Sequence, residues 1–465
     1  MILTVDIGTS SMKGGLISDE GYLFSYHRVK FPHTALGGNG QFSVQLWIDG
    51  FSEIVEAVGA EKVSAVAISG NGPTMVPVGK NGMPLGSVLL WHFNQSEGIG
   101  KTSSYYLPKI KWLQVHDPDR YEKAELFLSC PELLMYLLTG EAVMVSPHKE
   151  FLPFIWDDES LDVLGLKRSA FPQIVDMGSI AGQVRVNPLL RTSLKSGTPV
   201  VACGSDFMAS LIGTGTVYPG RICDRAGTSE GINYCSPKPL GNPHLRELPH
   251  AVEGMVNISA ILSSTGSLFE WYRHLTGQEG LRYDETMEGV RNTSPEQEHP
   301  VFFPNLKQGL LWEFSNGMFT GLDPGQGKFE LGRAVMEAIA FAVRRSLEIF
   351  ESFGLPVEEL RISGGQGKSR VWNQMKADIT GKRILIPEIE DAELLGDACL
   401  AAVALGRYPD ILKSSDELVK IKHQINPDSD LQKLYDSKYL RYRERCDGVK
   451  AFYMDSPGHK KGLWS

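Results

Sequence analysis

The sequence predicts an α/β protein built from two similar domains. Its 465 residues exceed what one hydrophobic core usually serves. A plan of strand, Gly-Thr-Ser turn and strand occurs in residues 2–17 and again in residues 221–235. The apolar run 198–202 leads into Cys203-Gly204-Ser205-Asp206, a pattern typical of a buried strand followed by a tightly packed helix. The repeat and this junction together favour a duplicated α/β domain.

The junction after residues 198–202 places one carboxylate, Asp206, at the end of a predicted strand. Ligands of open α/β sheets bind beyond the carboxyl ends of the strands, so an aspartate there can contact a substrate. The alternative is a helix N-cap, because Asp is a favoured N-cap residue. Considered alone, the junction favours the cap. The other motifs favour the substrate role.

The first hairpin carries Asp6-Ile7-Gly8-Thr9-Ser10-Ser11 at its tip. Glycine and hydroxyl residues in a turn offer backbone N–H groups and side-chain oxygens to an anion, and a nearby aspartate can hold the accompanying metal. One copy would be an ordinary polar turn. A second copy, Gly227-Thr228-Ser229, indicates that each domain presents a phosphate-binding hairpin to a shared cleft.

Apolar periodicity predicts the remaining elements. Between the hairpins we expect strands over 63–69, 74–78 and 88–91, and helical structure over 108–140 with proline punctuation. In the second half we expect helices over 330–353, 371–380 and 393–405, and a strand over 360–362. Tyr218-Pro219-Gly220 is the candidate domain boundary, and we expect residues from about Asp447 to be partly mobile.

A glycine-rich turn, Ser363-Gly364-Gly365-Gln366-Gly367-Lys368-Ser369, joins the strand over 360–362 to the helix over 371–380. Such a turn lets a ligand approach the backbone at a helix N-terminus, which suits an adenosine or phosphate group. The glycines do not have the spacing of a Walker A loop.

The composition excludes several classes of protein. A formal net charge of −9 without a strong basic cluster argues against nucleic acid or an anionic membrane as the main partner. The six cysteines are scattered without Cys-x-x-Cys spacing, which is typical of reduced residues in a cytoplasmic protein. The chain has no run of 18 apolar residues and begins on a predicted strand, so we expect a cytoplasmic protein that neither is secreted nor spans a membrane.

An ordered set of motifs resembles the FGGY carbohydrate kinases, xylulokinase-like members of the actin-like, Hsp70-like ATPase superfamily, over nearly the whole chain. The set is Asp6-Ile7-Gly8-Thr9-Ser10-Ser11-x-Lys13, Ile68-Ser69-Gly70, Leu89-Leu90-Trp91, Leu138-Thr139-Gly140-Glu141, Gly204-Ser205-Asp206, Gly227-Thr228-Ser229, Gly364-Gly365 with Lys368-Ser369 and Trp372, and Ala377-Asp378-Ile379-Thr380-Gly381. The resemblance implies two ribonuclease H-like domains facing a central cleft. The N-terminal domain, 1–220, would hold the sugar and the catalytic base, the C-terminal domain, 221–446, would hold the nucleotide, and 447–465 would be a tail.

The resemblance also implies roles for individual residues. Asp206 would be the general base that accepts the proton of a substrate hydroxyl during its attack on the γ-phosphate of ATP. Asp6 would hold Mg²⁺ through water. The other expected nucleotide-binding residues are Gly8, Thr9, Ser10 and Lys13 in the first domain and Gly227, Thr228, Gly364, Gly365, Ser369 and Asn373 in the second. For Asn373 a solvated helix position is the alternative.

The expected sugar-binding residues depart from the family pattern. Asn71-Gly72-Pro73 stands where relatives carry Gln-Met-His, and Trp91-His92-Phe93-Asn94-Gln95 replaces Trp-x-Asp-x-Arg. Phe207 follows Asp206 where a polar residue is usual, and Lys307-Gln308-Gly309-Leu310-Leu311 replaces Gly-Glu-Arg-x-Pro. Loss of these hydrogen-bonding groups predicts an altered, less polar acceptor pocket. We expect Asn71, Gly72, Trp91 and Phe207 to line it, with His92, Asn94, Gln95 or Lys307 as sources of replacement contacts.

The leading hypothesis is an ATP-dependent kinase of a small sugar, ketose, polyol or sugar acid, with ATP and Mg²⁺ as cofactors. One alternative is a non-catalytic family member that binds a nucleotide or metabolite. Another is an actin- or Hsp70-like ATPase that acts on protein partners, which leaves Ile68-Ser69-Gly70 and Leu138-Thr139-Gly140-Glu141 unexplained. The expected partners are small molecules, and since dimerisation is common in the family the resemblance allows a homodimer.

Overall fold

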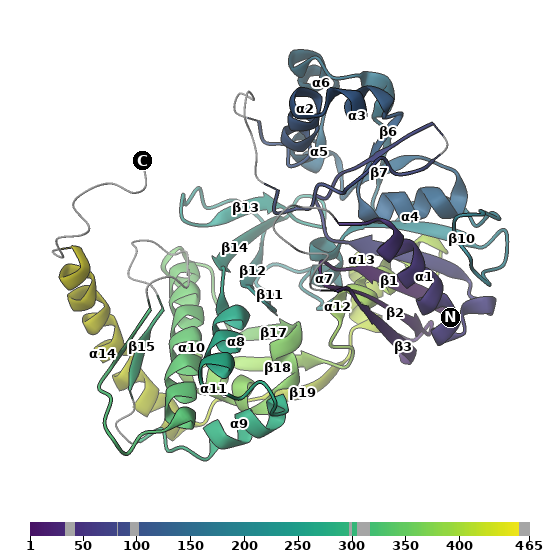
Figure 1. The fold of residues 1–465 in the computed structure, drawn as a ribbon. Helices are drawn as coiled ribbons and strands as arrows, with labels where there is room; N and C mark the ends of the chain where they lie inside the picture. The colour runs from purple at the N-terminus through teal and green to yellow at the C-terminus, as the bar shows by residue number, and fades with distance from the viewer. Residues whose placement is uncertain (33–41, 81, 94–101, 297–299, 305–316, 455–465) are drawn as a thin grey trace. The chain divides into compact units, whose positions relative to one another are not determined.

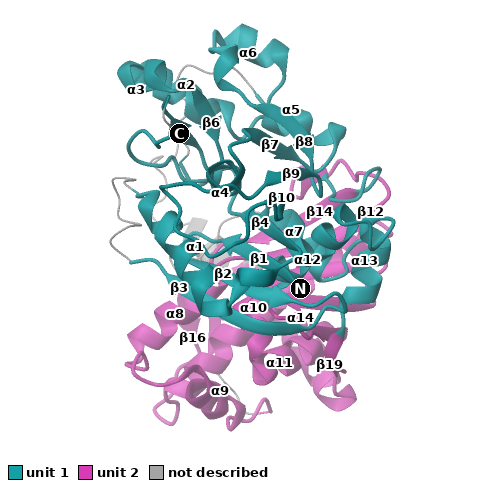
Figure 2. Cartoon of the chain, turned by 90° about the vertical axis from the view of Figure 1, so that its right-hand side faces the viewer, with its two compact units in different colours: residues 1–217, 249–255, 391–420 teal, residues 218–248, 256–390, 421–465 magenta. Residues whose placement is uncertain are grey.

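The structure is a computed structural model that describes residues 1–32, 42–80, 82–93, 102–296, 300–304 and 317–454 (Figure 1). The described chain forms two compact units (Figure 2). Unit 1 comprises residues 1–217, 249–255 and 391–420, and unit 2 comprises residues 218–248, 256–390 and 421–465. The first division falls at Tyr218, next to the Tyr218-Pro219-Gly220 turn. The predicted N-terminal domain ended at residue 220. Unit 1, however, also includes two later segments, 249–255 and 391–420.

Unit 1 is built on a six-stranded sheet of order β3-β2-β1-β4-β10-β9 (Figure 2). Its strands are β1 (Ile2–Ile7), β2 (Ser11–Ile17), β3 (Leu23–Lys30), β4 (Ala65–Gly70), β9 (Ile180–Gln183) and β10 (Pro199–Ser205). β1, β4 and β10 run parallel, while β2, β3 and β9 add antiparallel edges. The parallel strands bury both faces, so they are almost continuously apolar.

Four helices cover this sheet. α1 (Gln45–Val58) packs on β2 and β3, and α4 (Cys130–Thr139) packs on β4, β9 and β10. α12 (Ala392–Ala404) packs on β1, β4 and β10 and also against α7 (Asp206–Gly213). α7 and α12 touch backbone to backbone, because a Cβ added at Gly213 would lie 1.8 Å from the carbonyl oxygen of Ala392. α12 therefore completes a sheet whose strands come from the first 205 residues of the chain.

The segment between β4 and β9 forms a smaller layer with its own apolar cluster, which includes Ile110, Phe127 and Trp156. The helical structure predicted over 108–140 is only partly right, because a strand, β6, interrupts it. The elements here are β5 (Val76–Val78), α2 (Leu107–His116), α3 (Pro118–Lys123), β6 (Leu126–Leu128), β7 (Val143–Ser146), α5 (Leu152–Ile155), α6 (Asp158–Leu164) and β8 (Gln173–Asp176). β5 pairs with β6, and β7 pairs with β8.

Unit 2 is built on a seven-stranded sheet of order β13-β14-β12-β11-β17-β18-β19. Its strands are β11 (Ile222–Ala226), β12 (Glu230–Ser236), β13 (Arg246–Pro249), β14 (Val256–Leu262), β17 (Glu359–Ser363), β18 (Arg383–Pro387) and β19 (Ile421–Ile425). The remaining elements are α8 (Thr265–Leu275), α9 (Tyr283–Arg291), β15 (Val301–Phe303), β16 (Met318–Thr320), α10 (Lys328–Ser352), α11 (Arg370–Thr380) and α14 (Ser429–Met454), with α13 (Ile411–Leu418) belonging to unit 1.

The two sheets share one plan, as the repeated hairpin predicts. In each, three antiparallel strands (β3-β2-β1 and β14-β12-β11) are followed by two parallel ones (β4-β10 and β17-β18). The hairpins differ in one detail. The residues that close the first are Ile7 and Met12, whereas Ala226 and Glu230 close the second, so the first tip is one residue longer. The predicted helix over 330–353 is confirmed as α10, with its apolar stripe in the core of unit 2.

Other expectations can be compared directly with the described residues. The six cysteines are free thiols, five of them buried, as their apolar surroundings predict. Residues 447–454, expected to be partly mobile, continue helix α14, and 455–465 lie outside the described residues. Within the described ranges no helix is both long and apolar enough to cross a membrane.

Candidate active site

The first hairpin places Asp6 and Lys13 opposite each other on β1 and β2. Lys13 Nζ lies 2.9 Å from Asp391 Oδ1, 3.7 Å from Asp6 Oδ2 and 3.8 Å from Glu393 Oε2. Burial alone would lower the pKa of Lys13, but the charges of Glu393, Asp6 and Asp391 outweigh it and raise the pKa. Lys13 is therefore a charged lysine surrounded by three carboxylates, two of which come from the start of α12. The sequence motif contained Lys13 and Asp6 but gave no sign of Asp391 or Glu393.

The hairpin tip turns through a hydrogen bond from the Gly8 N–H to the Ser11 carbonyl, 3.0 Å. The adjacent hydroxyl, Thr9 Oγ1, accepts a hydrogen bond from Trp91 Nε1 at 2.9 Å. The indole of Trp91 is otherwise largely exposed. An expected phosphate-binding residue and an expected acceptor-binding residue are thus brought together in unit 1.

Asp206 is the first residue of α7, directly after the carboxyl end of β10. The helix is capped by Ser205, whose Oγ accepts a hydrogen bond from the Met208 N–H at 3.4 Å. The N-cap interpretation of Asp206 is therefore wrong, because the preceding serine performs that role. Asp206 is half-buried and directly follows Gly204 and Ser205, which both line a pocket.

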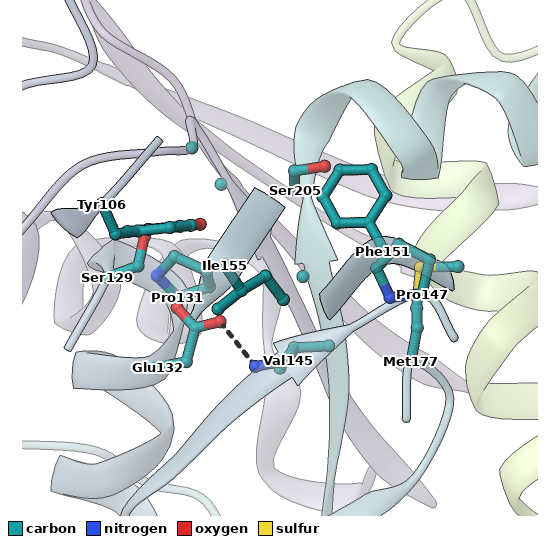
Figure 3. Close-up of a pocket in the computed structure, with 13 residues that line it drawn as sticks. Tyr106, Ser129, Pro131, Glu132, Val145, Pro147, Phe151, Ile155, Met177 and Ser205 are labelled. Carbon is teal, nitrogen blue, oxygen red and sulfur yellow. Dashed lines mark hydrogen bonds between the residues drawn. The ribbon is translucent and has the colours of Figure 1, made fainter. Parts of the chain in front are cut away.

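This pocket, which we call the strand-end pocket, lies entirely within unit 1 (Figure 3). Tyr106, Ser129 and Glu132 lie on one side of it, and Phe151 and Met177 lie on the other (Figure 3). Its complete lining is Gly70, Gly72, Tyr106, Ser129, Pro131, Glu132, Val145, Pro147, Phe151, Ile155, Met177, Gly204 and Ser205. Polar groups of Tyr106, Ser129, Glu132 and Ser205 stand among apolar side chains in this lining.

The expected acceptor residues are distributed differently from the prediction. Gly72 lines the strand-end pocket, and a Cβ there would lie 3.4 Å from the Tyr106 hydroxyl. Asn71 does not, because its side-chain amide donates to the Ile7 carbonyl and accepts from the Thr74 hydroxyl. Phe207 lies on α7, outside this lining.

Phe93, offered as evidence of a less polar pocket, packs instead edge-on against Trp112 with ring centroids 4.8 Å apart. It therefore belongs to the apolar cluster of the small layer. His92 lies beside Trp91, with ring centroids 5.4 Å apart. Asn94, Gln95 and Lys307–Leu311 lie outside the described residues.

The second hairpin tip, Gly227–Ser229, is exposed and lies against the start of α8 in unit 2. The Ser267 N–H donates to the Thr228 carbonyl at 3.1 Å, and a Cβ at Gly266 would lie 2.1 Å from the Gly227 carbonyl oxygen. Only glycine permits this approach. It brings a helix N-terminus, whose N–H groups and dipole favour anions, next to the hairpin. The sequence gave no indication of this role for Gly266.

The glycine-rich turn follows β17 and begins at Gly364. Its φ of +85° is a backbone conformation that glycine adopts without strain and other residues disfavour. Ser369 caps α11 by accepting from the Trp372 N–H at 3.2 Å. Asn373 is fully buried, so its interpretation as a solvated helix residue is wrong. Its Nδ2 donates to the Gly367 carbonyl at 3.0 Å and to the Gln366 carbonyl at 3.4 Å. Asn373 therefore fixes the shape of the turn, while Gly365 faces open space.

A buried charge cluster lies between the second hairpin and α11 in unit 2. Lys376 on α11 lies 2.5 Å from Asp224 on β11 and 2.6 Å from Glu230 on β12, and all three side chains are inaccessible to solvent. Burial and the Glu230 charge raise the pKa of Asp224, against the opposing effect of Lys376. Gln366 Nε2 lies 3.5 Å from Glu230, which links the glycine-rich turn to the second hairpin.

Comparison with known proteins gives this arrangement a family. Models of the FGGY family of carbohydrate kinases match residues 1–106 and 92–213 with the N-terminal domain and residues 225–405 with the C-terminal domain. The chain belongs to the FGGY family. The match to the family's C-terminal domain ends at Leu405, so that domain includes α12 in the sequence. In the structure α12 packs in unit 1.

Relatives and solved structures agree with that membership. An autoinducer-2 kinase of Salmonella typhimurium is 23% identical, with 98% of this chain and 94% of the relative covered. A gluconate kinase structure from Lactobacillus acidophilus has a TM-score of 0.80 at 18% identity, covering 97% of this chain and 98% of the other. A xylulose kinase structure from Rhodospirillum rubrum has a TM-score of 0.79 at 20% identity, covering 97% and 99%. The predicted fold class is thereby confirmed.

The sequence analysis did not identify several residues of the candidate site. Tyr106, Ser129, Glu132 and Ser205 supply the polar groups of the strand-end pocket, and none was among the expected acceptor residues. Glu132 left one signal, since it is the only charged residue in the apolar run Cys130–Thr139. A charge within a buried helix is uncommon unless it has a function or a partner.

Proposed function

We propose that the chain catalyses ATP-dependent phosphorylation of a hydroxyl group on a small sugar, ketose or polyol, with Asp206 as general base. The observation that carries the proposal is the place of Asp206. It follows directly on the strand end that lines the strand-end pocket, and Ser205 rather than Asp206 caps the helix. Membership of a carbohydrate kinase family supplies the reaction class.

In the proposed mechanism Asp206 accepts the proton of the acceptor hydroxyl as that oxygen attacks the γ-phosphorus. Phosphoryl transfer depends mainly on positioning and on electrostatic stabilisation of the transferring group, so one well-placed carboxylate is an adequate base. Helix α7 holds the carboxylate in place, because close packing against α12 fixes the helix. The strand-end pocket presents the acceptor to it.

The first hairpin is proposed to contact the transferring phosphate through the Gly8 backbone and the hydroxyls of Thr9 and Ser10. Asp6 is the proposed ligand, through water, of the Mg²⁺ that accompanies the nucleotide. Its surroundings fit a cation, because Asp6, Asp391 and Glu393 face the single positive charge of Lys13. The ion would neutralise charge on the phosphate oxygens. Among the described residues no three His, Cys, Asp or Glu side chains form a metal-binding group.

In unit 2, Gly227 and Thr228 are proposed to hold the β/γ-phosphate region, assisted by the N-terminus of α8. The turn Gly364–Gly365 and the α11 N-terminus are proposed to form the adenosine side. Asn373 then acts indirectly, since its amide holds the turn. These assignments extend the sequence interpretation, and the contacts of Gly266 and Asn373 support them.

The acceptor is best sought among small compounds with several hydroxyls. Matched relatives and structures carry the names autoinducer-2 kinase, xylulose kinase and gluconate kinase, so these names define the first panel. An ADP-release assay with autoinducer-2, D-xylulose, D-gluconate and common polyols tests the proposal. ADP release that no compound stimulates would favour the alternative of a non-catalytic binding protein.

Asp206→Asn keeps the shape of the side chain and removes its basicity. We expect ATP binding to persist and turnover with the best acceptor to fall by about 10²-fold or more. Asp49→Asn is the matched control, because Asp49 is an exposed carboxylate of unit 1 that accepts a hydrogen bond from Gln45. Turnover of Asp206→Asn equal to that of the control would contradict the assignment.

A further inference from the structure

Strand β3 is the outer strand of the six-stranded sheet in unit 1 (Figure 2). Among the described residues, no strand and no isolated β-bridge pairs with its outer edge. An uncovered edge strand is a template for pairing with another chain. This edge carries two exposed aromatic side chains, because Phe24 is 69% exposed and Tyr26 is 40% exposed. Its surface therefore has both the backbone and the apolar area that a partner strand needs.

The ladder between β2 and β3 determines which backbone groups of β3 point outward. The Phe31 N–H donates to the Ser10 carbonyl at 2.8 Å, and residues 25–30 are in continuous register with residues 11–16. Because hydrogen-bonded pairs alternate in an antiparallel ladder, residues 25, 27 and 29 bond to β2. Residues 26, 28 and 30 then direct their N–H and C=O groups away from β2. A register shift at Phe24 ends this regular stretch.

The exposed side chains of this edge alternate with half-buried ones. Phe24, Tyr26, Arg28 and Lys30 are exposed, and the three residues between them are half-buried. The exposed set thus lies on one face of the strand, with two aromatic rings at its start and two cations at its end. An antiparallel second copy of the same stretch would place the rings of each copy opposite the cations of the other.

The pairing that achieves this is centred on His27. Phe24 then lies opposite the partner's Lys30, and Tyr26 lies opposite the partner's Arg28, so each kind of pair occurs twice. Cations and aromatic rings in directly opposite positions attract each other. Centring the pairing on Arg28 would instead oppose like charges, and centring it on Tyr26 would carry it past the register shift at Phe24.

Two contacts within the chain support these pairs. Lys420 Nζ lies 3.3 Å from the centroid of the Tyr22 ring, so a cation already covers the aromatic residue just before β3. The Tyr26 hydroxyl is hydrogen-bonded to the carboxyl group of Asp391. An arginine that faces Tyr26 therefore also approaches an acidic group.

We propose that a second copy of this chain pairs with the outer edge of β3, antiparallel and centred on His27. The two six-stranded sheets then continue into each other across a twofold axis, and the same patch is used on both copies. This inference does not depend on the proposed function, because it uses only the edge of the sheet.

Sedimentation velocity over about 1–100 µM protein tests the association, since an interface along one strand is small and its affinity modest. We expect wild type to change from monomer to dimer across this range. A protein that stays monomeric at the highest concentration would overturn the inference, and the cations of β3 would then only protect a solitary edge.

Phe24→Lys removes one ring and sets a second cation opposite the partner's Lys30. Because each change occurs twice in the dimer, we expect dimerisation to weaken by about tenfold or more. Val163→Lys is the matched control, since Val163 is a 79% exposed apolar residue on α6 of the same unit. Equal dimerisation of the two variants would show that the copies associate through another surface.

A disulfide tests the register. In the proposed pairing His27 faces the partner's His27 at a non-hydrogen-bonded position, where side chains are close enough for a disulfide. His27→Cys should therefore give a covalent dimer under mild oxidation. The control is Ser25→Cys, because its two thiols would lie about 13 Å apart, four residues along the strand. Wild type controls for the native thiols. Equal cross-linking of both variants, or of neither, would overturn the proposed pairing.

Discussion

The indole nitrogen of Trp91 donates a hydrogen bond to the hydroxyl of Thr9 across 2.9 Å. Thr9 lies at the tip of the first hairpin, and Trp91 follows Leu90 at the end of the segment that pairs with residues near β5. The bond ties a loop of the small layer to the proposed phosphate-binding turn. The turn is also held by the backbone bond between Gly8 and Ser11, by the Phe31 N–H, which donates to the Ser10 carbonyl, and by Arg28 Nε, which donates to the Ser11 hydroxyl.

Trp91→Phe keeps an aromatic ring and removes the donor, so we expect kcat/KM to fall by about 2- to 10-fold, the effect of one hydrogen bond. Thr9→Val should have a similar effect, and the double variant should lose little more than either single one. Steady-state kinetics of the four proteins check this. Strictly additive losses of kcat/KM would show that the two residues act independently and not through their hydrogen bond.

Glu132 also predicts a pH dependence of stability. Burial raises its pKa from 4.5 to about 7, with opposing hydrogen bonds from the backbone and from Ser129. Between these values the unfolded chain releases the proton and the folded chain keeps it, so stability falls as pH rises. Relative to Glu132→Gln, wild type should lose about 3 kcal/mol between pH 4.5 and 7, and little more above that. Urea unfolding across this range measures the difference, and a constant difference would contradict it.

Lys376→Met leaves two buried carboxylates, Asp224 and Glu230, without their cation. We expect the free energy of unfolding to fall by about 3–5 kcal/mol, because the carboxylates stay buried without the positive charge that offsets their desolvation. The control is Lys433→Met, since Lys433 pairs with Asp430 on the exposed surface and should change stability by about 0.5 kcal/mol or less. Equal effects in denaturant titration would show that the buried cluster is not strongly coupled.

The contact between α7 and α12 predicts that small residues are required on both helices. A Cβ at Gly396 would lie 1.9 Å from the Ala209 carbonyl oxygen, so Gly396→Ala must push the helices apart. We expect a loss of roughly 1–3 kcal/mol or more, as for overpacked cores, and reduced turnover because α7 carries Asp206. Gly280→Ala is the control, since nothing lies within 4 Å of a Cβ there. A fully active, equally stable Gly396→Ala would contradict this account.

The sequence predicted the strands and hairpins best, because their signals are local. Glycine and hydroxyl residues between two apolar runs fixed the positions of β1-β2 and β11-β12. The strand β6 was missed because its three residues, Leu126–Leu128, lie between helical segments and are too few to show a period of two.

The site was harder to predict because pocket walls are made by long-range packing. Asn71 was expected to line the pocket, but its side chain is occupied by backbone and threonine partners, and Phe207 lies outside the pocket lining. Asp391 and Glu393 reach Lys13 across a gap of more than 370 residues, which no local pattern records. The family motifs located the ends of the strands correctly. The side chains that surround those ends come mainly from residues between the motifs, which the motifs do not predict.

The crossing of α12 into unit 1 has a consequence for synthesis of the chain. Strands β1, β4 and β10 are complete once residue 205 has emerged from the ribosome, but the helix that covers them begins at Ala392. At about 5–20 residues per second, this part of the sheet waits on the order of 10–40 s for its cover. During that interval the face of these strands that α12 covers lacks its helix. A gene fragment ending at residue 217 would lack α12 altogether, so we expect unit 1 to fold fully only when residues 391–420 are present.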